Sequence, residues 1–96
     1  MKLAFRESVE GEILEAAVWY EGKSAELGTS FRSAVLLVIE KILENPRSYQ
    51  KRYGEIRRAG IERFPYGVYY AILLDTVHVL GVLHDARHPD TWQRRS

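Results

Sequence analysis

The sequence predicts an α+β domain in which a small antiparallel β-sheet, with the element order β-α-α-β-β-β, carries a two-helix hairpin packed on one face. Three observations predict this class: two successive apolar patterns at helical spacing, a change to strand-like composition after Pro46, and turn-forming residues between the later strands. The chain has 96 residues, of which 46% are hydrophobic, enough for one core. We therefore expect a single domain spanning residues 1–96.

The first half of the chain predicts one short strand and two helices. Residues 3–5 are expected to form the strand. The first helical pattern consists of Val9, Ile13, Ala16, Ala17 and Tyr20, and the second of Phe31, Val35, Val38 and Ile42. The second helix should start near Thr29 and end at Asn45, because the residue before a proline is disfavoured in the helical region. The break at residues 22–28 is short, so the two helices should form an antiparallel hairpin.

The second half predicts three consecutive antiparallel strands, at residues 55–64, 67–75 and 76–87. They follow a polar connection at residues 47–54. Pro65, Tyr66 and Gly67 have the backbone preferences of a tight turn, and Asp75 with Thr76 should form the next reversal. Residues 68–74 are apolar on both faces of the pleat, as is typical of a central strand.

The charges are divided unevenly between the two halves. Residues 1–46 hold five Lys/Arg and eight Glu, a net charge of −3, whereas residues 47–96 hold nine Lys/Arg and five Asp/Glu, a net charge of +4. Arginine predominates in the basic half, and its planar guanidinium suits bidentate recognition of phosphate or carboxylate. This indicates a polyanion or an acidic protein as a partner, although an excess of this size is also ordinary for a solvated surface.

Several classes of protein are excluded or disfavoured by composition. The chain has no cysteine, which excludes disulfides and thiolate zinc sites. Its apolar runs are shorter than the roughly 20 residues that span a bilayer, and charged residues interrupt the start of the chain where a signal peptide would be apolar. We expect a cytoplasmic protein without a membrane partner.

Three arginines in the stretch RRAGIERFPYGVYY are candidate binding residues. Arg57, Arg58 and Arg63 are placed by the prediction on the first strand of the meander. Alternation puts Arg57 and Arg63 on one face and Arg58 on the other, unless Gly60 forms a bulge. They either contact an anionic partner or simply face solvent on an edge strand, where charge discourages aggregation.

The histidines and aromatic residues add weaker candidates. His78, His84 and His88 lack the spacing of a metal site, so no metal is predicted. His84 lies beside Arg87 at the end of the last strand, where it could act as an acid or base. Trp92 either lines a groove or attaches the tail to the domain. Tyrosines in a sheet can stack on bases, but Tyr70 is expected in the core. No nucleophile–base pair or phosphate-binding loop is present, so no catalytic residue and no cofactor is predicted.

Taken in order, these segments resemble the RelE/ParE family of toxins from type II toxin–antitoxin (plasmid stabilisation) modules. The resemblance rests on AAVWYE, LGTSFRSAV, ILENPRSY, IRRAGIERFPYGVYYAI and DTVHVLGVLHDARHPDTW. It covers residues 5–92. The most specific parts are ERFPYGVYY at residues 62–70 and the pattern H-x-x-R-x-P-x-x-W formed by His84, Arg87, Pro89 and Trp92.

The resemblance implies one of two activities. One branch of the family cuts messenger RNA on the ribosome with a metal-independent set of Arg, Lys and a C-terminal Tyr, and the other inhibits DNA gyrase. In the nuclease branch an Arg usually precedes the V-x-Y of the central strand, and a Tyr closes the chain. Here those positions hold Gly67 and Trp92, neither of which can do the same chemistry. The gyrase-type branch is favoured, and a ribosome-dependent endoribonuclease using the basic residues with His84 is the alternative.

The resemblance also implies an antitoxin partner, with which the chain should form a hetero-oligomer. Such antitoxins bind along the toxin through a C-terminal tail. We expect an acidic and apolar tail that covers Arg57, Arg58 and Arg63 and folds as it binds. The remaining candidate contacts, with the antitoxin or with the target, are His84, Arg87 and Trp92.

Overall fold

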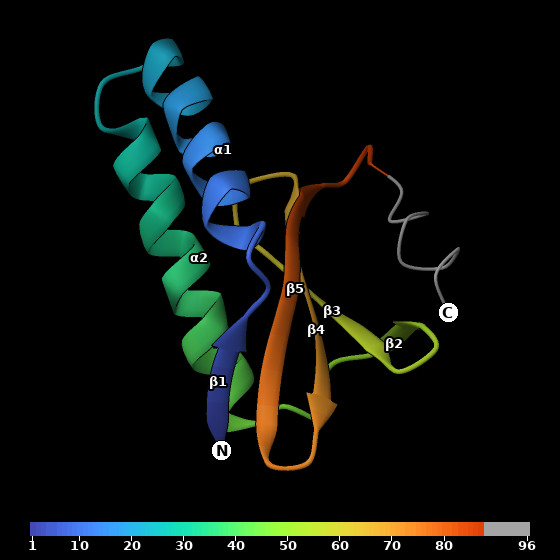
Figure 1. The fold of residues 1–96 in the computed structure, drawn as a ribbon. Helices are drawn as coiled ribbons and strands as arrows, with labels where there is room; N and C mark the ends of the chain where they lie inside the picture. The colour runs from blue at the N-terminus through green and yellow to red at the C-terminus, as the bar shows by residue number, and fades with distance from the viewer. Residues whose placement is uncertain (88–96) are drawn as a thin grey trace.

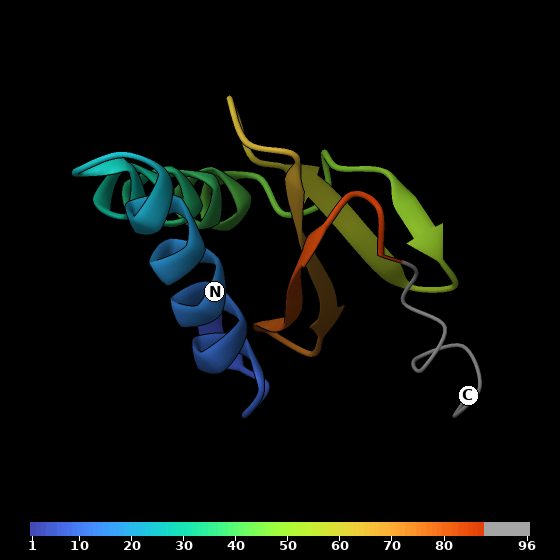
Figure 2. The ribbon, with the colours of Figure 1, turned by 90° about the horizontal axis from the view of Figure 1, so that it is seen from above.

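A computed structural model describes residues 1–87 of the chain as two helices packed on a five-stranded sheet. The elements in chain order are β1 (Lys2–Phe5), α1 (Val9–Lys23), α2 (Leu27–Glu44), β2 (Lys51–Tyr53), β3 (Ile56–Gly60), β4 (Tyr66–Leu73) and β5 (Thr76–His84). Both helices lie on the same side of the sheet (Figure 1), and the view from above separates the two layers (Figure 2). The predicted α+β class and its helical hairpin are confirmed.

The strands follow the order β1-β5-β4-β3-β2. The pairs β3–β4 and β4–β5 are antiparallel, as predicted, and so is β2–β3. The strand β1 differs, because it pairs in parallel with β5, from Lys2 opposite Thr76 to Phe5 opposite Val79. The sheet is therefore mixed, with β1 at one edge and β2 at the other.

Two connections differ from the sequence-based prediction. The stretch at residues 47–54, expected to be a polar connection, contains the short strand β2. This strand ends at Tyr53, which pairs with Ile56 of β3. The turn after β3 occupies residues 61–65, not Pro65 to Gly67, because the Ile61 N–H donates to the Tyr66 carbonyl at 2.9 Å and Tyr66 already belongs to β4. Thr76 likewise begins β5 instead of ending a turn.

The register between β3 and β4 is regular, from Arg57 opposite Tyr70 to Gly60 opposite Gly67, so Gly60 forms no bulge. The irregularity lies instead between Tyr69 and Tyr70, where β4 pairs with β5. Alternation then places Tyr70 on the side of the sheet that the helices cover. We call the opposite side, which carries Arg58 and Gly67, the helix-free face.

The helical hairpin is closed by one carboxylate. Glu21 of α1 accepts hydrogen bonds from the backbone N–H groups of Glu26 and Gly28, each at 2.9 Å, and so caps the start of α2. Gly28 allows the two helices to meet closely, because a Cβ there would lie 2.4 Å from the Ala17 carbonyl oxygen. The helices consequently pack backbone against backbone at this end.

The core lies between the hairpin and the sheet. Its fully buried side chains include Phe31, Ile42, Val68, Tyr70 and Val79. The Tyr70 hydroxyl donates to the Pro46 carbonyl at 2.6 Å, and burial raises the pKa of Tyr70 to about 12. The expected core role of Tyr70 is confirmed. Within residues 1–87 no helix is long and apolar enough to cross a bilayer.

Candidate functional site

Arg58 lies across Gly67 on the helix-free face. Arg58 projects from β3, and a Cβ on Gly67 would lie 2.6 Å from the Arg58 Nε and 2.9 Å from its Cζ. The neighbouring cross-strand position is also a glycine, Gly60. The absence of side chains at these two positions lets the guanidinium lie flat on the sheet.

The guanidinium is held there by Asp85, just beyond the end of β5. The Arg58 Nη2 lies 2.5 Å from the Asp85 Oδ1, and the Arg58 side chain is 20% exposed. Burial lowers the pKa of Arg58, but the hydrogen bonds with Asp85 and Tyr69 outweigh it and leave the pKa above its ordinary value. Arg58 is therefore a fixed cation, largely neutralised by its own chain.

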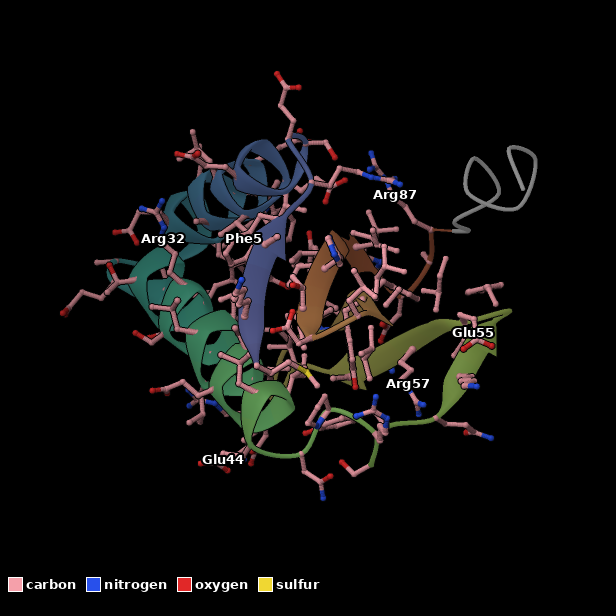
Figure 3. All side chains as sticks on the ribbon, turned by 60° about the horizontal axis from the view of Figure 1, so that its bottom comes forward. Phe5, Arg32, Glu44, Glu55, Arg57 and Arg87 are labelled. Carbon is pink, nitrogen blue, oxygen red and sulfur yellow. The ribbon has the colours of Figure 1, made fainter. Side chains whose placement is uncertain are left out.

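Arg57 lies on the opposite side of the sheet from Arg58. Its Nη1 donates to the carbonyls of Tyr49 at 2.6 Å and Arg47 at 3.2 Å. Figure 3 shows Arg57 beside the connection that leaves α2, well separated from Arg87. Arg57 thus stabilises the loop between α2 and β2.

Arg63 does not lie on β3, and this part of the prediction is wrong. It sits in the turn after the strand with a φ of 71°, because β3 ends at Gly60 and the chain reverses before Tyr66. Arg63 lines a cavity of about 490 Å³ beside α2, together with Ser33 and Lys41. The three arginines consequently occupy three separate environments.

His84 and Arg87 line a cavity of about 700 Å³ between α1 and the end of β5. The His84 Nδ1 accepts a hydrogen bond from the Ala86 N–H at 2.9 Å, and its ring lies edge-on to Tyr66, with centroids 5.1 Å apart. The sequence-based prediction brought these two residues together correctly. Trp92 and His88 lie outside the described residues.

The sequence-based prediction missed the α1 side of this cavity. Glu12, Glu15 and Trp19 line it, with Tyr20 adjoining. Glu12 reaches β5, where its Oε1 accepts a hydrogen bond from the Val82 N–H at 2.9 Å. Burial raises the pKa of Glu12 above its ordinary value, even though the Val82 hydrogen bond, Arg87 and Arg6 all lower it. The spacing of residues 12, 15 and 19 along one helical face was the available signal.

Residues 1–87 contain no group of three or more His, Cys, Asp or Glu side chains that could hold a metal ion. The side chains described here offer cations, carboxylates and aromatic rings.

Comparison with known proteins gives structural similarities. No protein-family model matches the sequence, and no curated protein matches it. The structure is similar to a chain of a chromosomal ParDE toxin–antitoxin system from P. aeruginosa, with a TM-score of 0.66 and 13% identity, covering 88% of this chain and 95% of that one. It is also similar to a mutant E. coli toxin RelE in complex with an antitoxin RelBc peptide, with a TM-score of 0.62 and 18% identity, covering 99% and 93%. The fold is that seen in these toxin–antitoxin structures.

Proposed function

We propose that this chain is the toxin of a type II toxin–antitoxin module and that it inhibits DNA gyrase by binding it. The fold, shared over nearly the whole chain with a ParDE and a RelE structure, supports the toxin assignment. The proposed site of action is the cytoplasm, and the proposed regulatory partner is an antitoxin that forms a hetero-oligomer with the chain.

The dispersal of the three arginines is the observation that favours binding over cleavage. Metal-independent cleavage of a phosphodiester needs cations that converge on the phosphate, together with a positioned acid and base. Arg58 is paired with Asp85, Arg57 is engaged with carbonyls, and Arg63 lies in a different cavity. This arrangement supports a protein-binding inhibitor.

The positions of the arginines also limit which of them one antitoxin tail can cover. Arg57 and Arg58 project from opposite faces of β3, so one extended tail would have to pass around the sheet to cover both. Arg58 is the member of the set that lies on the helix-free face. We assign the acidic part of the antitoxin tail to the Arg58 side, where it would compete with Asp85.

Messenger-RNA cleavage is the second candidate, and one observation favours it. The Arg58 guanidinium lies over Gly67. Arg58 of β3 therefore places a cation at position 67 of β4, although glycine itself provides no charged side chain. If Asp85 were displaced, this cation would become available to a phosphate. The nuclease therefore remains the alternative against which the gyrase proposal is tested.

A supercoiling assay with purified protein tests the proposal directly. We expect inhibition of gyrase, together with cleaved DNA and an SOS response when the chain is expressed without its antitoxin. Arg58→Gln should raise the concentration of protein needed for half-inhibition by about tenfold. This is the size of effect expected when a residue at the centre of an interface is substituted. Arg32→Gln is the matched control, because Arg32 is an exposed arginine on α2, away from the helix-free face (Figure 3).

Transcript cleavage in a translation extract separates the two candidates. Intact gyrase activity at micromolar toxin, with messenger RNA cut on ribosomes, would replace the gyrase proposal with the nuclease. Failure of both assays, with normal growth, would contradict the toxin assignment itself.

A further inference from the structure

The cavity between α1 and β5 has an apolar body with charged groups in its wall. Its volume is about 700 Å³, and it is formed by residues that are far apart in the sequence. Val18 of α1, which is 63% exposed, contributes aliphatic surface, and Trp19 and Tyr66 contribute aromatic surface. Val82 and Leu83 of β5 also line the cavity but are themselves buried. A cavity of this size accepts a long side chain together with part of its backbone.

Two carboxylates line the cavity on the α1 side. Glu12 and Glu15 face it one helical turn apart, and Glu7 and Glu10 add further negative charge near the start of the helix. A carboxylate has two oxygens, and the Val82 N–H engages the Oε1 of Glu12. The Oε2 of Glu12 and the Glu15 carboxylate add acceptor capacity to the cavity wall.

The charge of Glu12 is incompletely compensated. Arg87 lies in the same cavity wall, and both Arg87 and Arg6 stabilise the ionised carboxylate, but burial outweighs them. His84 also lines the cavity, and its Nδ1 already accepts a hydrogen bond from the Ala86 N–H. Counting Glu7 and Glu10 near the start of α1, four carboxylates stand against the two arginines that act on Glu12, so carboxylates are in excess around the cavity.

The aromatic wall suits the same type of ligand. Trp19 is 57% exposed, and the Lys23 ammonium already lies 4.8 Å from the centre of its ring. An ammonium or guanidinium over an indole face is attracted by the quadrupole of the ring. A partner's cation would take the place of the Lys23 ammonium on Trp19, and a second ring, Tyr66, also lines the cavity.

We propose that this cavity binds a lysine or arginine side chain that an apolar peptide segment of a partner protein presents. The cation is held between Glu12 and Glu15 and against the aromatic wall, while the flanking apolar residues cover the exposed side chains of Val18 and Trp19. The site is centred on α1 and the C-terminal end of β5, whereas the acidic tail is assigned to Arg58 on β3. It does not depend on which target the toxin attacks.

Anisotropy titrations with two fluorescein-labelled peptides test the cation. The probe is the heptapeptide Gly-Ser-Leu-Arg-Leu-Gly-Ser, and its neutral analogue carries citrulline in place of arginine. We expect the arginine peptide to bind at least about tenfold more tightly, because hydrogen bonds to a charged group in a partly buried site are strong. A third peptide with glutamate at the central position should show no saturable binding.

Variants of α1 locate the site. Glu12→Gln should weaken binding of the arginine peptide by about tenfold, and Glu15→Gln should weaken it by about threefold, because each substitution removes a negative charge from the cavity wall. Glutamine at position 12 keeps an acceptor for the Val82 N–H, so the fold is retained. Glu10→Gln is the matched control, since it removes the same charge from an exposed position of the same helix, and we expect less than about a twofold effect.

Arg87→Gln provides a test of opposite sign. Removing the cation that already lines the cavity should strengthen binding of the arginine peptide by about threefold. Equal binding of the arginine and citrulline peptides would overturn the proposal, as would equal effects of Glu12→Gln and Glu10→Gln. Tighter binding of the glutamate peptide would show that Arg87 makes this an anion site, again overturning it. None of these outcomes alters the gyrase assay, so the two proposals fail independently.

Discussion

Gly28 and Gly67 both allow a close approach, but they meet different kinds of neighbour. At Gly28 the obstacle to a side chain is the Ala17 carbonyl oxygen, a backbone atom fixed in α1. At Gly67 the obstacle is the guanidinium of Arg58, the far end of a flexible side chain. The first glycine maintains the packing of the hairpin, whereas the second maintains the position of one cation. Stability should therefore depend on Gly28, and recognition on Gly67.

The largest effect is expected from Gly28→Ala. A methyl group 2.4 Å from the Ala17 oxygen forces the helices apart, which should lower the free energy of unfolding by about 2 kcal/mol even after the gain in helix propensity. Urea denaturation measures this difference. Gly11→Ala is the matched control, because a Cβ there has nothing within 4 Å and should stabilise the chain by up to about 1 kcal/mol. Equal effects of the two substitutions would contradict the packing role.

Glu21→Ala should destabilise the same end of the hairpin by about 1 kcal/mol. The substitution leaves the N–H groups of Glu26 and Gly28 without the carboxylate that caps them. Hydrogen exchange should show faster exchange at those two amides, with little change in β4. Uniform acceleration across the sheet would indicate instead that the loss is global.

Gly67→Ala should change stability by less than about 1 kcal/mol, because the guanidinium can move away. The same substitution should separate Arg58 from Asp85 and change gyrase inhibition as much as Arg58→Gln does. NMR of the Arg58 Nε–H reports the separation. A large loss of stability with unchanged inhibition would reverse the contrast between the two glycines.

Glu12→Gln should have the smallest effect on stability, and one that depends on pH. The folded state holds the Glu12 proton more readily than the unfolded state, because the folded pKa of Glu12 is raised above its ordinary value of 4.5. The contribution of this proton to stability is therefore present below pH 4.5 and is lost as the pH rises through the folded pKa. The glutamine variant should be more stable than the parent by about 0.5 kcal/mol at neutral pH, and the difference should vanish at low pH. Unfolding curves at several pH values measure it, and a gap that widens on acidification would refute the assignment.

The local patterns of the sequence were sufficient for the helices and for most of the sheet. The apolar residues Phe31, Val35 and Ile42 recur with the period of a helix and form the buried stripe of α2. The direction of β1 had no such signal, because its partner residues in β5 lie at the other end of the described chain. The error at Arg63 has a local cause, since the turn begins at Ile61, before the Pro-Tyr-Gly sequence that suggested it.

The candidate sites were predicted less well than the fold. His84 and Arg87 were found because they are close in sequence, whereas Glu12 and Asp85 were missed because each acts across a long stretch of chain. The glycine at position 67 was taken to mean that no cation lies there, but the Arg58 guanidinium from the neighbouring strand packs over its backbone. Sequence spacing identifies neighbours along one element, and such contacts between elements require the structure.

The parallel pairing of β1 with β5 determines when the chain can complete its fold during synthesis. Lys2 leaves the ribosome well before Thr76, its partner in β5, and cannot pair until Thr76 has also emerged. At translation rates of about 5 to 20 residues per second, this separation corresponds to roughly 4 to 15 seconds. The hairpin of α1 and α2 involves only nearby residues and can form within that interval. The β3–β4 hairpin that carries Arg58 is also local, so the pairing of β1 with β5 is the step that completes the sheet.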